Sequence, residues 1–275
     1  MSVEESTLVC PGALITQNPG FIKGHGTYQK EDQLQATVAG HIERINRLVT
    51  VRPFKSARYS GEVGDVIVGR ISDVAQKKWK VDIYARQDAS LQLSAVNLPG
   101  GELRRRSVED ELMMREYLAE SDLISAEVQK VSSEDGLVHL HTRSLKYGKL
   151  GQGILIALKP SNIKRSKTHF HNLPCGVSVI MGNNGYIWVG STLPVEDESG
   201  GHVIDSEVIQ RSEREAIARV GNIIRLLAEN EVLIYDTSVI TAYDLSSNYE
   251  TKDLIKKSVK DELIVMVKMK LATQI

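Results

Sequence analysis

The residues that could carry catalysis or bind a metal are few in this 275-residue sequence, and they lie far apart. His169 and His171 would share one face of a strand, but no cysteine or carboxylate lies near them in sequence to complete a zinc site. Cys175 has no evident base beside it to activate a thiolate nucleophile. No group of carboxylates resembles the metal-binding acids of a hydrolytic nuclease. We therefore predict no catalytic residue, no metal ion and no cofactor, and expect that the chain is not an enzyme.

The chemistry that the sequence does offer is cationic. No acidic residue occurs between Asp135 and Glu196, whereas seven lysines and arginines do. Clustered cations attract the phosphates of a nucleic acid even at a net charge of -1, because salt confines the field of each charge to roughly 8–10 Å. A solvated stretch that merely lacks carboxylates is the alternative. From this stretch we predict RNA contacts for Lys146, Lys149, Lys164, Arg165 and Lys167.

A second candidate site combines charge with an aromatic ring. Lys77, Lys78 and Trp79 lie on an expected strand. Proteins that bind single strands place cations along the phosphates and stack bases on aromatic rings. The alternation of side chains along a strand could instead direct Trp79 into a core. Both interpretations of Trp79 remain open, and we predict RNA contacts for the three residues.

Three consecutive arginines, Arg104, Arg105 and Arg106, form the densest positive cluster in the chain. They follow a glycine-containing stretch that predicts a loop. The planar guanidinium suits phosphate and also stacks on bases. Ion pairs with the acids at 109–111, or an interface with another protein, are the alternatives. We predict that these arginines contact RNA.

The elements that must position these residues are short and mixed in type. Strand-like segments at 66–71, 77–83, 90–93, 123–128 and 137–141, with a helix at 109–119 inserted among them, describe a five-stranded OB-fold barrel. Before this barrel, two strands flank Asn46 and Arg47 as a hairpin in a small β-rich region. After it, 154–158, 177–180 and 186–189 are strand-like, 232–235 is weakly so, and two helices follow. The fold class is α+β.

A glycine-bounded motif, Gly182, Asn183, Asn184 and Gly185, separates two of these strands. It has the spacing of the Gly-x-x-Gly loop with which a KH domain clamps a nucleic-acid backbone. Apolar strand-like runs flank it, however, and no lysine or arginine lies between its glycines. We therefore predict a hairpin of type I′, which requires positive φ at Asn184 and Gly185.

The helical segments and the membrane question follow from periodicity and run length. Ile217, Val220, Ile224 and Leu227 recur at helical spacing, as do Ile255, Val259, Leu263 and Met266. No run approaches the roughly 20 apolar residues of a membrane span. Two distant cysteines and an acidic N-terminus indicate a reducing compartment, and we expect no membrane partner.

Longer motifs resemble a known family. Segments 61–71 and 136–144 resemble the opening and closing strands of an S1 domain. Segments 97–106, 145–153, 167–171 and 182–185 resemble the eukaryotic exosome cap subunits of the ribosomal RNA-processing protein 4 family, also called exosome component two. The resemblance extends from Pro11 to about Tyr243.

This resemblance implies three small domains: an N-terminal β-rich domain at 1–58, an S1 domain at 59–145 and a KH-like domain at 146–275. It implies that the glycine-bounded motif packs between the S1 and KH-like domains. It also implies a non-catalytic cap subunit that contacts the phosphorolytic-ribonuclease-like ring and other cap subunits. Such a subunit stabilises the ring and guides single-stranded RNA to a three-prime to five-prime exoribonuclease, in rRNA processing and RNA decay.

For a member of this family we expect the nucleus, nucleolus and cytoplasm as locations. The alternative function is a free-standing S1/KH factor that binds RNA in translation or transcription.

Overall fold

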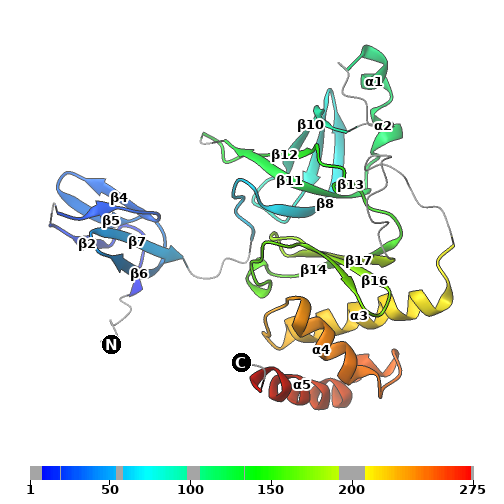
Figure 1. Cartoon of the computed structure of the whole chain (residues 1–275). Coiled ribbons are helices and arrows are strands. Elements are labelled where there is room, and N and C mark those ends of the chain that lie inside the picture. The colour runs from blue at the N-terminus through cyan, green and yellow to red at the C-terminus, as the bar shows by residue number, and fades with distance from the viewer. Residues whose placement is uncertain are drawn as a thin grey trace. The chain divides into compact units, whose positions relative to one another are not determined.

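The computed structural model describes residues 8–18, 20–53, 58–97, 106–132, 134–191 and 208–273. The chain divides into two compact units, Met1–Ser56 and Ala57–Ile275. Figure 1 labels the helices and strands of both units. Each unit is described by itself.

The first unit is built from seven short strands. They form two sheets, with the orders β1-β6-β7-β3 and β2-β5-β4. Val9, Ala36 and Val51 are buried between them. The expected hairpin is confirmed, because β6 pairs with β7 from Gly40↔Pro53 to Ile45↔Leu48 and leaves only two residues in the turn. The strands are β1 (Leu8–Val9), β2 (Leu14–Thr16), β3 (Ile22–Lys23), β4 (Thr27–Lys30), β5 (Gln33–Ala36), β6 (Gly40–Ile45) and β7 (Leu48–Pro53).

The second unit begins with the expected five-stranded barrel. Its sheet has the order β12-β10-β9-β8-β11-β13. An additional pairing of β12 with β11 closes the first five strands into the barrel, and the short β13 pairs with β11 as a sixth strand. In β9 the burial of side chains alternates, so Trp79 and Val81 enter the barrel while Lys78 and Lys80 face outward. The strands are β8 (Val66–Ala75), β9 (Lys78–Asp82), β10 (Ala89–Val96), β11 (Leu123–Val131), β12 (Val138–Thr142) and β13 (Gly148–Lys149).

The inserted helix is present as two short pieces. Ser107 caps α1 (Val108–Leu112): its hydroxyl accepts from the Asp110 backbone N–H, and the Asp110 carboxylate accepts from the Ser107 backbone N–H. A second helix, α2 (Met114–Tyr117), follows directly. Met114 and Leu118 anchor this segment in the barrel core.

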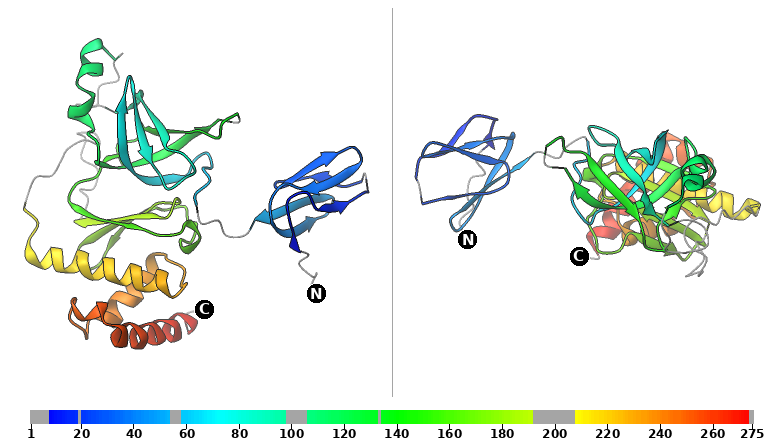
Figure 2. Two further views of the ribbon diagram at one scale, coloured as in Figure 1. Left: turned by 180° about the vertical axis from the view of Figure 1, so that it is seen from behind. Right: turned by 90° about the horizontal axis from the view of Figure 1, so that it is seen from above.

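The rest of the second unit is a four-stranded sheet with helices on one face. The strand order is β14-β17-β16-β15, and every residue of β16 is buried. Strands covered on both faces have such continuous apolar sequences. Here α3 packs against β14, β16 and β17, and the barrel lies on the other side of the sheet (Figures 1 and 2). The strands are β14 (Gly153–Ala157), β15 (Phe170–Leu173), β16 (Val177–Met181) and β17 (Tyr186–Ser191).

The helices of this part are partly as expected. In α3 (Arg211–Glu229) the four periodic apolar residues are all buried, as predicted. The expected strand at 232–235 is wrong, because only Ile234 makes an isolated bridge, with Ile163. The helix α4 (Asp236–Ser246) was not anticipated, since its β-branched residues weaken the helical pattern. The last helix, α5 (Lys257–Ala272), buries Leu263, whereas Ile255 is exposed in the preceding 3-10 turn η2 (Asp253–Ile255).

Candidate nucleic-acid interface

The outer face of β9 and β10 forms a shallow hollow at the turn between β8 and β9. Lys77 lies at this turn with a φ of 61°, and its ammonium is 3.0 Å from a carboxylate oxygen of Glu111. Lys78 is exposed and pairs with no residue that the structure describes. Cations and hydrogen-bonding groups therefore meet here, on strands two and three of the barrel, where OB folds bind their ligands. The lining residues are Gln76, Lys77, Lys78, Gln92, Leu93, Ser94, Arg106 and Glu111.

Trp79 belongs to the core, so the prediction that it contacts RNA is wrong. Its side chain is 0% exposed, and its indole N–H donates to the Leu118 carbonyl oxygen at 2.9 Å. A ring buried in this way cannot stack on a base. The alternation of β9 decides this outcome, since it exposes Lys78 and Lys80 and turns the residue between them inward.

Of the three consecutive arginines, the structure describes only Arg106; Arg104 and Arg105 lie outside the described residues. The Arg106 guanidinium donates to the carbonyl oxygens of Leu93, at 3.2 Å, and of Val96. Its other terminal nitrogen is buried and has no hydrogen-bond partner among the residues that the structure describes. Arg106, just before α1, is thus bonded to β10 through backbone carbonyls rather than to the acids of α1.

The acid-free stretch obtains its counter-charges from distant parts of the chain. The Lys149 ammonium is 2.6 Å from the Asp122 carboxylate, and both side chains are largely buried. Arg165 makes a two-pronged pair with Glu62, at 2.7 and 3.1 Å. These partners occupy two of the cations that the sequence assigns to phosphate.

The remaining cations of this stretch are less engaged. The ammonium groups of Lys146 and Lys164 lie over the rings of Tyr147 and Tyr235, at 4.9 and 4.7 Å from the ring centroids. Lys167 is exposed and pairs with no described residue. The RNA contacts of all these residues stay predictions.

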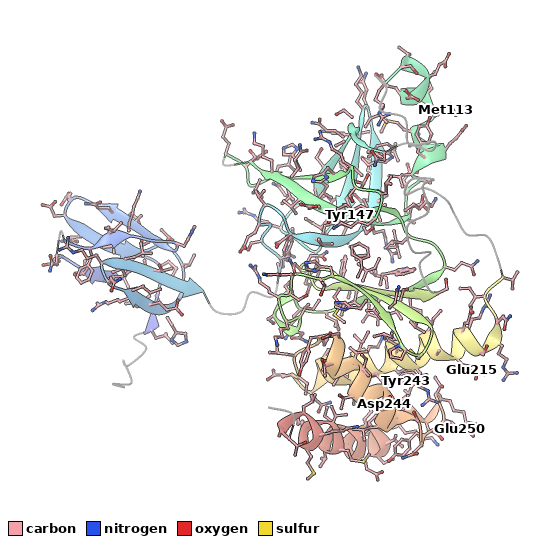
Figure 3. All side chains as sticks on the ribbon, in the orientation of Figure 1. Met113, Tyr147, Glu215, Tyr243, Asp244 and Glu250 are labelled. Atoms are coloured by element: carbon pink, nitrogen blue, oxygen red, sulfur yellow. The ribbon has the colours of Figure 1, made fainter. Side chains whose placement is uncertain are left out.

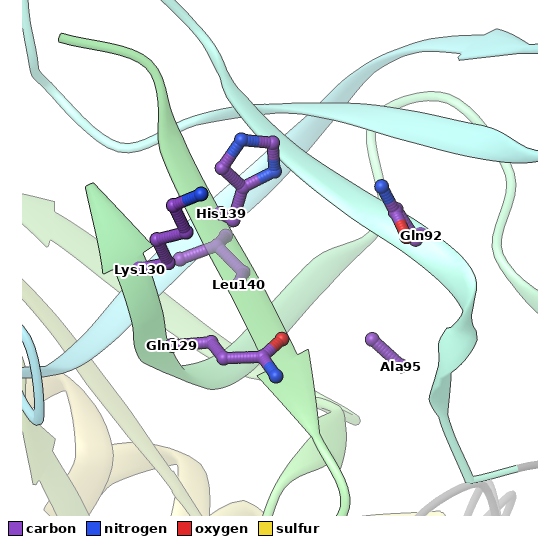
Figure 4. A pocket seen from close by; sticks show the side chains of 6 residues that line it. All are labelled: Gln92, Ala95, Gln129, Lys130, His139 and Leu140. Carbon is purple, nitrogen blue, oxygen red and sulfur yellow. The ribbon is translucent and has the colours of Figure 1, made fainter. Parts of the chain in front are cut away.

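A second hollow lies between β10, β11 and β12 (Figure 4). Its walls carry two glutamines, a lysine and a histidine, and Ala95 and Leu140 are buried in its floor. None of the four polar residues was anticipated. The available signal was weak: Gln129 and Lys130 are consecutive polar residues that interrupt the alternation of β11. The lining residues are Gln92, Ala95, Gln129, Lys130, His139 and Leu140.

The glycine-bounded motif is a hairpin turn between β16 and β17, as predicted, and it is not a clamp between two helices. The expected type I′ geometry is wrong, because Gly185 has a φ of 93° while Asn184 is not in the left-handed region. The Gly185 N–H donates to the Gly182 carbonyl oxygen at 3.1 Å, and the Gly182 N–H donates to Tyr186 at 3.0 Å. These bonds describe the three-residue loop in which a tight turn is followed by a left-handed glycine.

The two asparagines of this turn join the sheet to the barrel. The Asn184 amide is 0% exposed and donates to the carbonyl oxygens of Val68 and Ile83, at 2.7 and 3.0 Å. The Asn183 amide donates to Asp65 at 2.8 Å, and its backbone N–H donates to Val66 at 2.9 Å. The expectation that this motif packs between the two domains is confirmed.

Apolar and aromatic side chains complete the same contact. Val68 of the barrel packs with Ile180, Tyr186 and Trp188 of the sheet. The Tyr186 hydroxyl donates to Asp82 at 3.0 Å, and burial followed by this carboxylate raises the Tyr186 pKa to about 12. Tyr147 also lies between the barrel and the sheet (Figure 3), with its ring 5.9 Å from that of Phe170.

The two histidines considered in the sequence analysis bond to nearby backbone carbonyls, and Cys175 is partly buried. His169 bonds to the Met181 carbonyl at 2.9 Å, and His171 to the Thr168 carbonyl at 3.2 Å. Burial raises the pKa of the Cys175 thiol. Within the described ranges, no group of three or more histidines, cysteines and acids could hold a metal ion. Nor does any described helix have the length and apolar character to cross a membrane.

Three family models match the chain in succession. The model described as "Exosome complex exonuclease RRP4 N-terminal region" matches residues 8–45. The model described as "RRP4, S1 domain" matches 58–130, and "KH domain" matches 153–195. The expected α+β fold with an N-terminal, an S1 and a KH domain is thereby confirmed.

Curated relatives align along almost the whole chain. It is 53% identical over 268 residues to "Exosome complex component RRP4" of Bos taurus, covering 97% of this chain and 91% of that protein, and the values for Mus musculus are the same. The protein of that name from Saccharomyces cerevisiae is 41% identical over 299 residues, covering 95% of this chain and 83% of that protein. Identity at this level, over a barrel and a sheet joined by the expected motif, shows that the chain belongs to the RRP4 family of exosome complex components.

Proposed function

We propose that this protein is a non-catalytic, RNA-binding cap subunit of the RNA exosome. In this role it stabilises the ring of phosphorolytic-ribonuclease-like subunits and contacts other cap subunits. It guides single-stranded RNA to a three-prime to five-prime exoribonuclease, in rRNA processing and RNA decay. The observation that carries the proposal is the near-complete alignment with exosome complex components, in which N-terminal, S1 and KH matches follow one another.

The assembly role is supported by the way the S1 and KH domains are joined. Asn184 bonds to two carbonyl oxygens of the barrel, and an apolar cluster surrounds this contact. A unit held together by buried hydrogen bonds and packing moves as one body. Such a unit suits a subunit that must hold a fixed place on a ring. We propose the limits 1–58, 59–145 and 146–275 for the three domains.

The RNA role is supported by the two polar hollows of the barrel. Exposed Lys78 and Lys130 stand among amide, hydroxyl and imidazole groups. This is the mixture of cations and hydrogen-bonding groups that contacts the phosphates and bases of a single strand. The predicted contacts of Arg104 and Arg105, which lie outside the described residues, would add phosphate binding.

Purification of the tagged full chain from cells tests the assembly role. We expect ring subunits and an associated exoribonuclease to co-purify at moderate salt, and we expect the protein in the nucleus, nucleolus and cytoplasm by microscopy. Recovery of RNA with no ring subunit would instead favour a free-standing S1/KH factor in translation or transcription.

Incubation with labelled single-stranded RNA tests the non-catalytic role. The purified chain, supplied with magnesium or manganese and with phosphate, should leave the RNA intact. RNA shortening that persists through further purification, and that a point mutation in this chain abolishes, would contradict the proposal.

A further inference from the structure

The strand β12 is flanked on both sides by irregular pairing. Against β11 the register passes from Val128↔Leu140 to Lys130↔His139, so Gln129 is an extra residue without a partner. Against β10 it passes from Leu91↔Leu140 to Val96↔Thr142, so β10 advances five residues while β12 advances two. Bulges of this kind bend a strand, turn side chains to new directions and are common beside functional sites.

The two irregularities direct glutamines into one hollow. Gln129 reaches in from β11, Gln92 from β10, and His139 stands on β12 between them (Figure 4). Ala95 leaves room on the β10 side because its side chain ends at Cβ. The hollow thus has amide groups on two opposing walls and an apolar floor of Ala95 and Leu140.

The polar groups of this hollow are available to a ligand. Gln129, Lys130 and His139 donate or accept no side-chain hydrogen bond with any residue that the structure describes, and Gln92 accepts only a long one, at 3.5 Å, from Ser94. Hydrogen bonds from Ser132 and Leu137 lower the pKa of Asp135, with a smaller contribution from the charge of His139. The Gln87 amide donates to the Asp135 carbonyl at 3.0 Å.

We propose that this hollow binds one purine base of single-stranded RNA by two of its edges. A primary amide offers a donor and an acceptor side by side, which match adjacent groups on a base edge. A purine has hydrogen-bonding groups on both its Watson–Crick and its Hoogsteen edge, whereas the second edge of a pyrimidine carries mainly C–H groups. Two glutamines on opposing walls therefore satisfy a purine more completely than a pyrimidine.

Lys130 and the barrel surface supply the rest of the site. The Lys130 ammonium stands at the rim beside Gln129, where it binds the phosphate of the same nucleotide. This hollow lies on the β10–β12–β11 side, next to the hollow of Lys77 and Lys78, with which it shares Gln92. An RNA single strand bound along β9 and β10 thus continues into the hollow between β10, β11 and β12. The inference rests on the proposed RNA binding and adds to it a base preference and the residues responsible.

The test measures the affinity of the full chain for labelled RNAs of about twelve nucleotides by fluorescence anisotropy. One RNA contains only uridine, and a second has a single central adenosine. A third has 7-deazaadenosine at that position, which lacks the Hoogsteen nitrogen. We expect the adenosine RNA to bind about five- to tenfold more tightly than the uridine RNA, since two added hydrogen bonds have an effect of that order. The 7-deaza RNA should lie between them.

Variants then assign the preference to residues. Gln92→Met and Gln129→Met keep the length of the side chain and remove its hydrogen bonds, so each should lower the affinity for adenosine RNA more than the affinity for uridine RNA and thereby reduce the preference. Gln29→Met, on the exposed strand β4 of the other unit, is the matched control and should change neither affinity. Lys130→Ala should weaken both RNAs and lower the salt slope by about 0.7. Thermal melts verify that each variant is folded.

Three results would overturn the inference, and they separate it from the proposed function. Equal affinity of the wild type for adenosine and uridine RNA, with salt-dependent binding, rejects the purine site and leaves RNA binding intact. Glutamine variants that weaken all RNAs equally show backbone contact rather than base recognition. No binding of any RNA rejects the RNA-binding role together with the site.

Discussion

The side-chain amide of Asn184 donates to the carbonyl oxygen of Val68 at 2.7 Å, although the two residues are 116 positions apart in sequence. The same amide nitrogen donates to Ile83 at 3.0 Å, and the Asn184 side-chain oxygen accepts a longer bond from the Val68 N–H. One fully buried amide therefore joins strand β8 of the barrel, and the residue that directly follows β9, to the turn of the sheet.

Replacing Asn184 should destabilise the second unit strongly. Asn184→Ala leaves the buried carbonyl oxygens of Val68 and Ile83 without these donors, and we expect a loss of about 3 kcal/mol in the free energy of unfolding. Asn183→Ala, at a half-buried position with one side-chain bond to Asp65, should cost about 1 kcal/mol and is the control. Urea unfolding measures both. Equal losses in the two variants would show that Asn184 does not hold the domains together.

Two features favour glycine at position 185: a positive φ and the lack of space for a Cβ atom. Their effects on stability can be measured separately. The φ of Gly185 is 93°, and a Cβ there would lie 2.3 Å from the Leu158 carbonyl oxygen. Gly176, with a φ of 75° between β15 and β16, has nothing within 4 Å of such a Cβ. Gly176→Ala should therefore cost only about 1–2 kcal/mol of left-handed strain. Gly185→Ala should cost clearly more and impair assembly without RNA present. Normal melting with lost RNA binding would instead identify a phosphate clamp.

Trp79 should affect stability and not RNA. Trp79→Phe removes the hydrogen bond to Leu118 and opens a cavity in the barrel core, and we expect a loss of about 2–3 kcal/mol. RNA affinity, measured well below the melting temperature, should be unchanged. Lys78→Ala is the contrasting variant, since it should weaken RNA binding at unchanged stability. A selective loss of RNA binding in Trp79→Phe would contradict the core assignment.

The arginine cluster should divide into two roles. Arg106→Ala removes donors from the carbonyl oxygens of Leu93 and Val96 and should lower the free energy of unfolding by about 1–3 kcal/mol. Replacing Arg104 and Arg105 together by alanine should leave stability nearly unchanged and weaken RNA binding. Melting curves and RNA titrations at one salt concentration compare the variants. Normal RNA affinity with lost co-purification of the ring would instead assign Arg104 and Arg105 to a protein interface.

Alkaline pH should weaken the contact made by Tyr186. Its pKa is raised from 10.0 to about 12, first by burial and then by Asp82, so the neutral phenol is favoured in the folded protein. The stability that this shift contributes is fully present below pH 10 and is lost as the pH rises towards about 12. Tyr186→Phe should therefore be less stable than the wild type at pH 9, by about 1 kcal/mol. Urea unfolding from pH 9 upward should show this difference shrinking, and a constant difference would contradict the shifted pKa.

Local patterns in the sequence were sufficient for the elements whose side chains face one environment. Apolar residues recur at helical spacing in α3, and apolar and polar residues alternate in β9. Each pattern indicates an element with one buried face, so both elements could be predicted. The flanks of the glycine-bounded motif, apolar on both sides, indicated strands and excluded a loop between helices. The turn type could not be read in this way, because it depends on which backbone carbonyls close the loop.

Tertiary structure decided which polar residues are free. Lys149 and Arg165 belong to the same acid-free stretch as Lys167, yet Asp122 and Glu62 neutralise the first two from distant positions. No local sequence pattern marks Gln92, Gln129 or His139 as a binding residue, so the sequence did not predict them. Only the two bulges beside β12 bring them into one hollow, and a bulge is set by how neighbouring strands pair. Composition and spacing can identify a family and a chemistry, whereas the partners of each charge and amide depend on contacts between residues far apart in the chain.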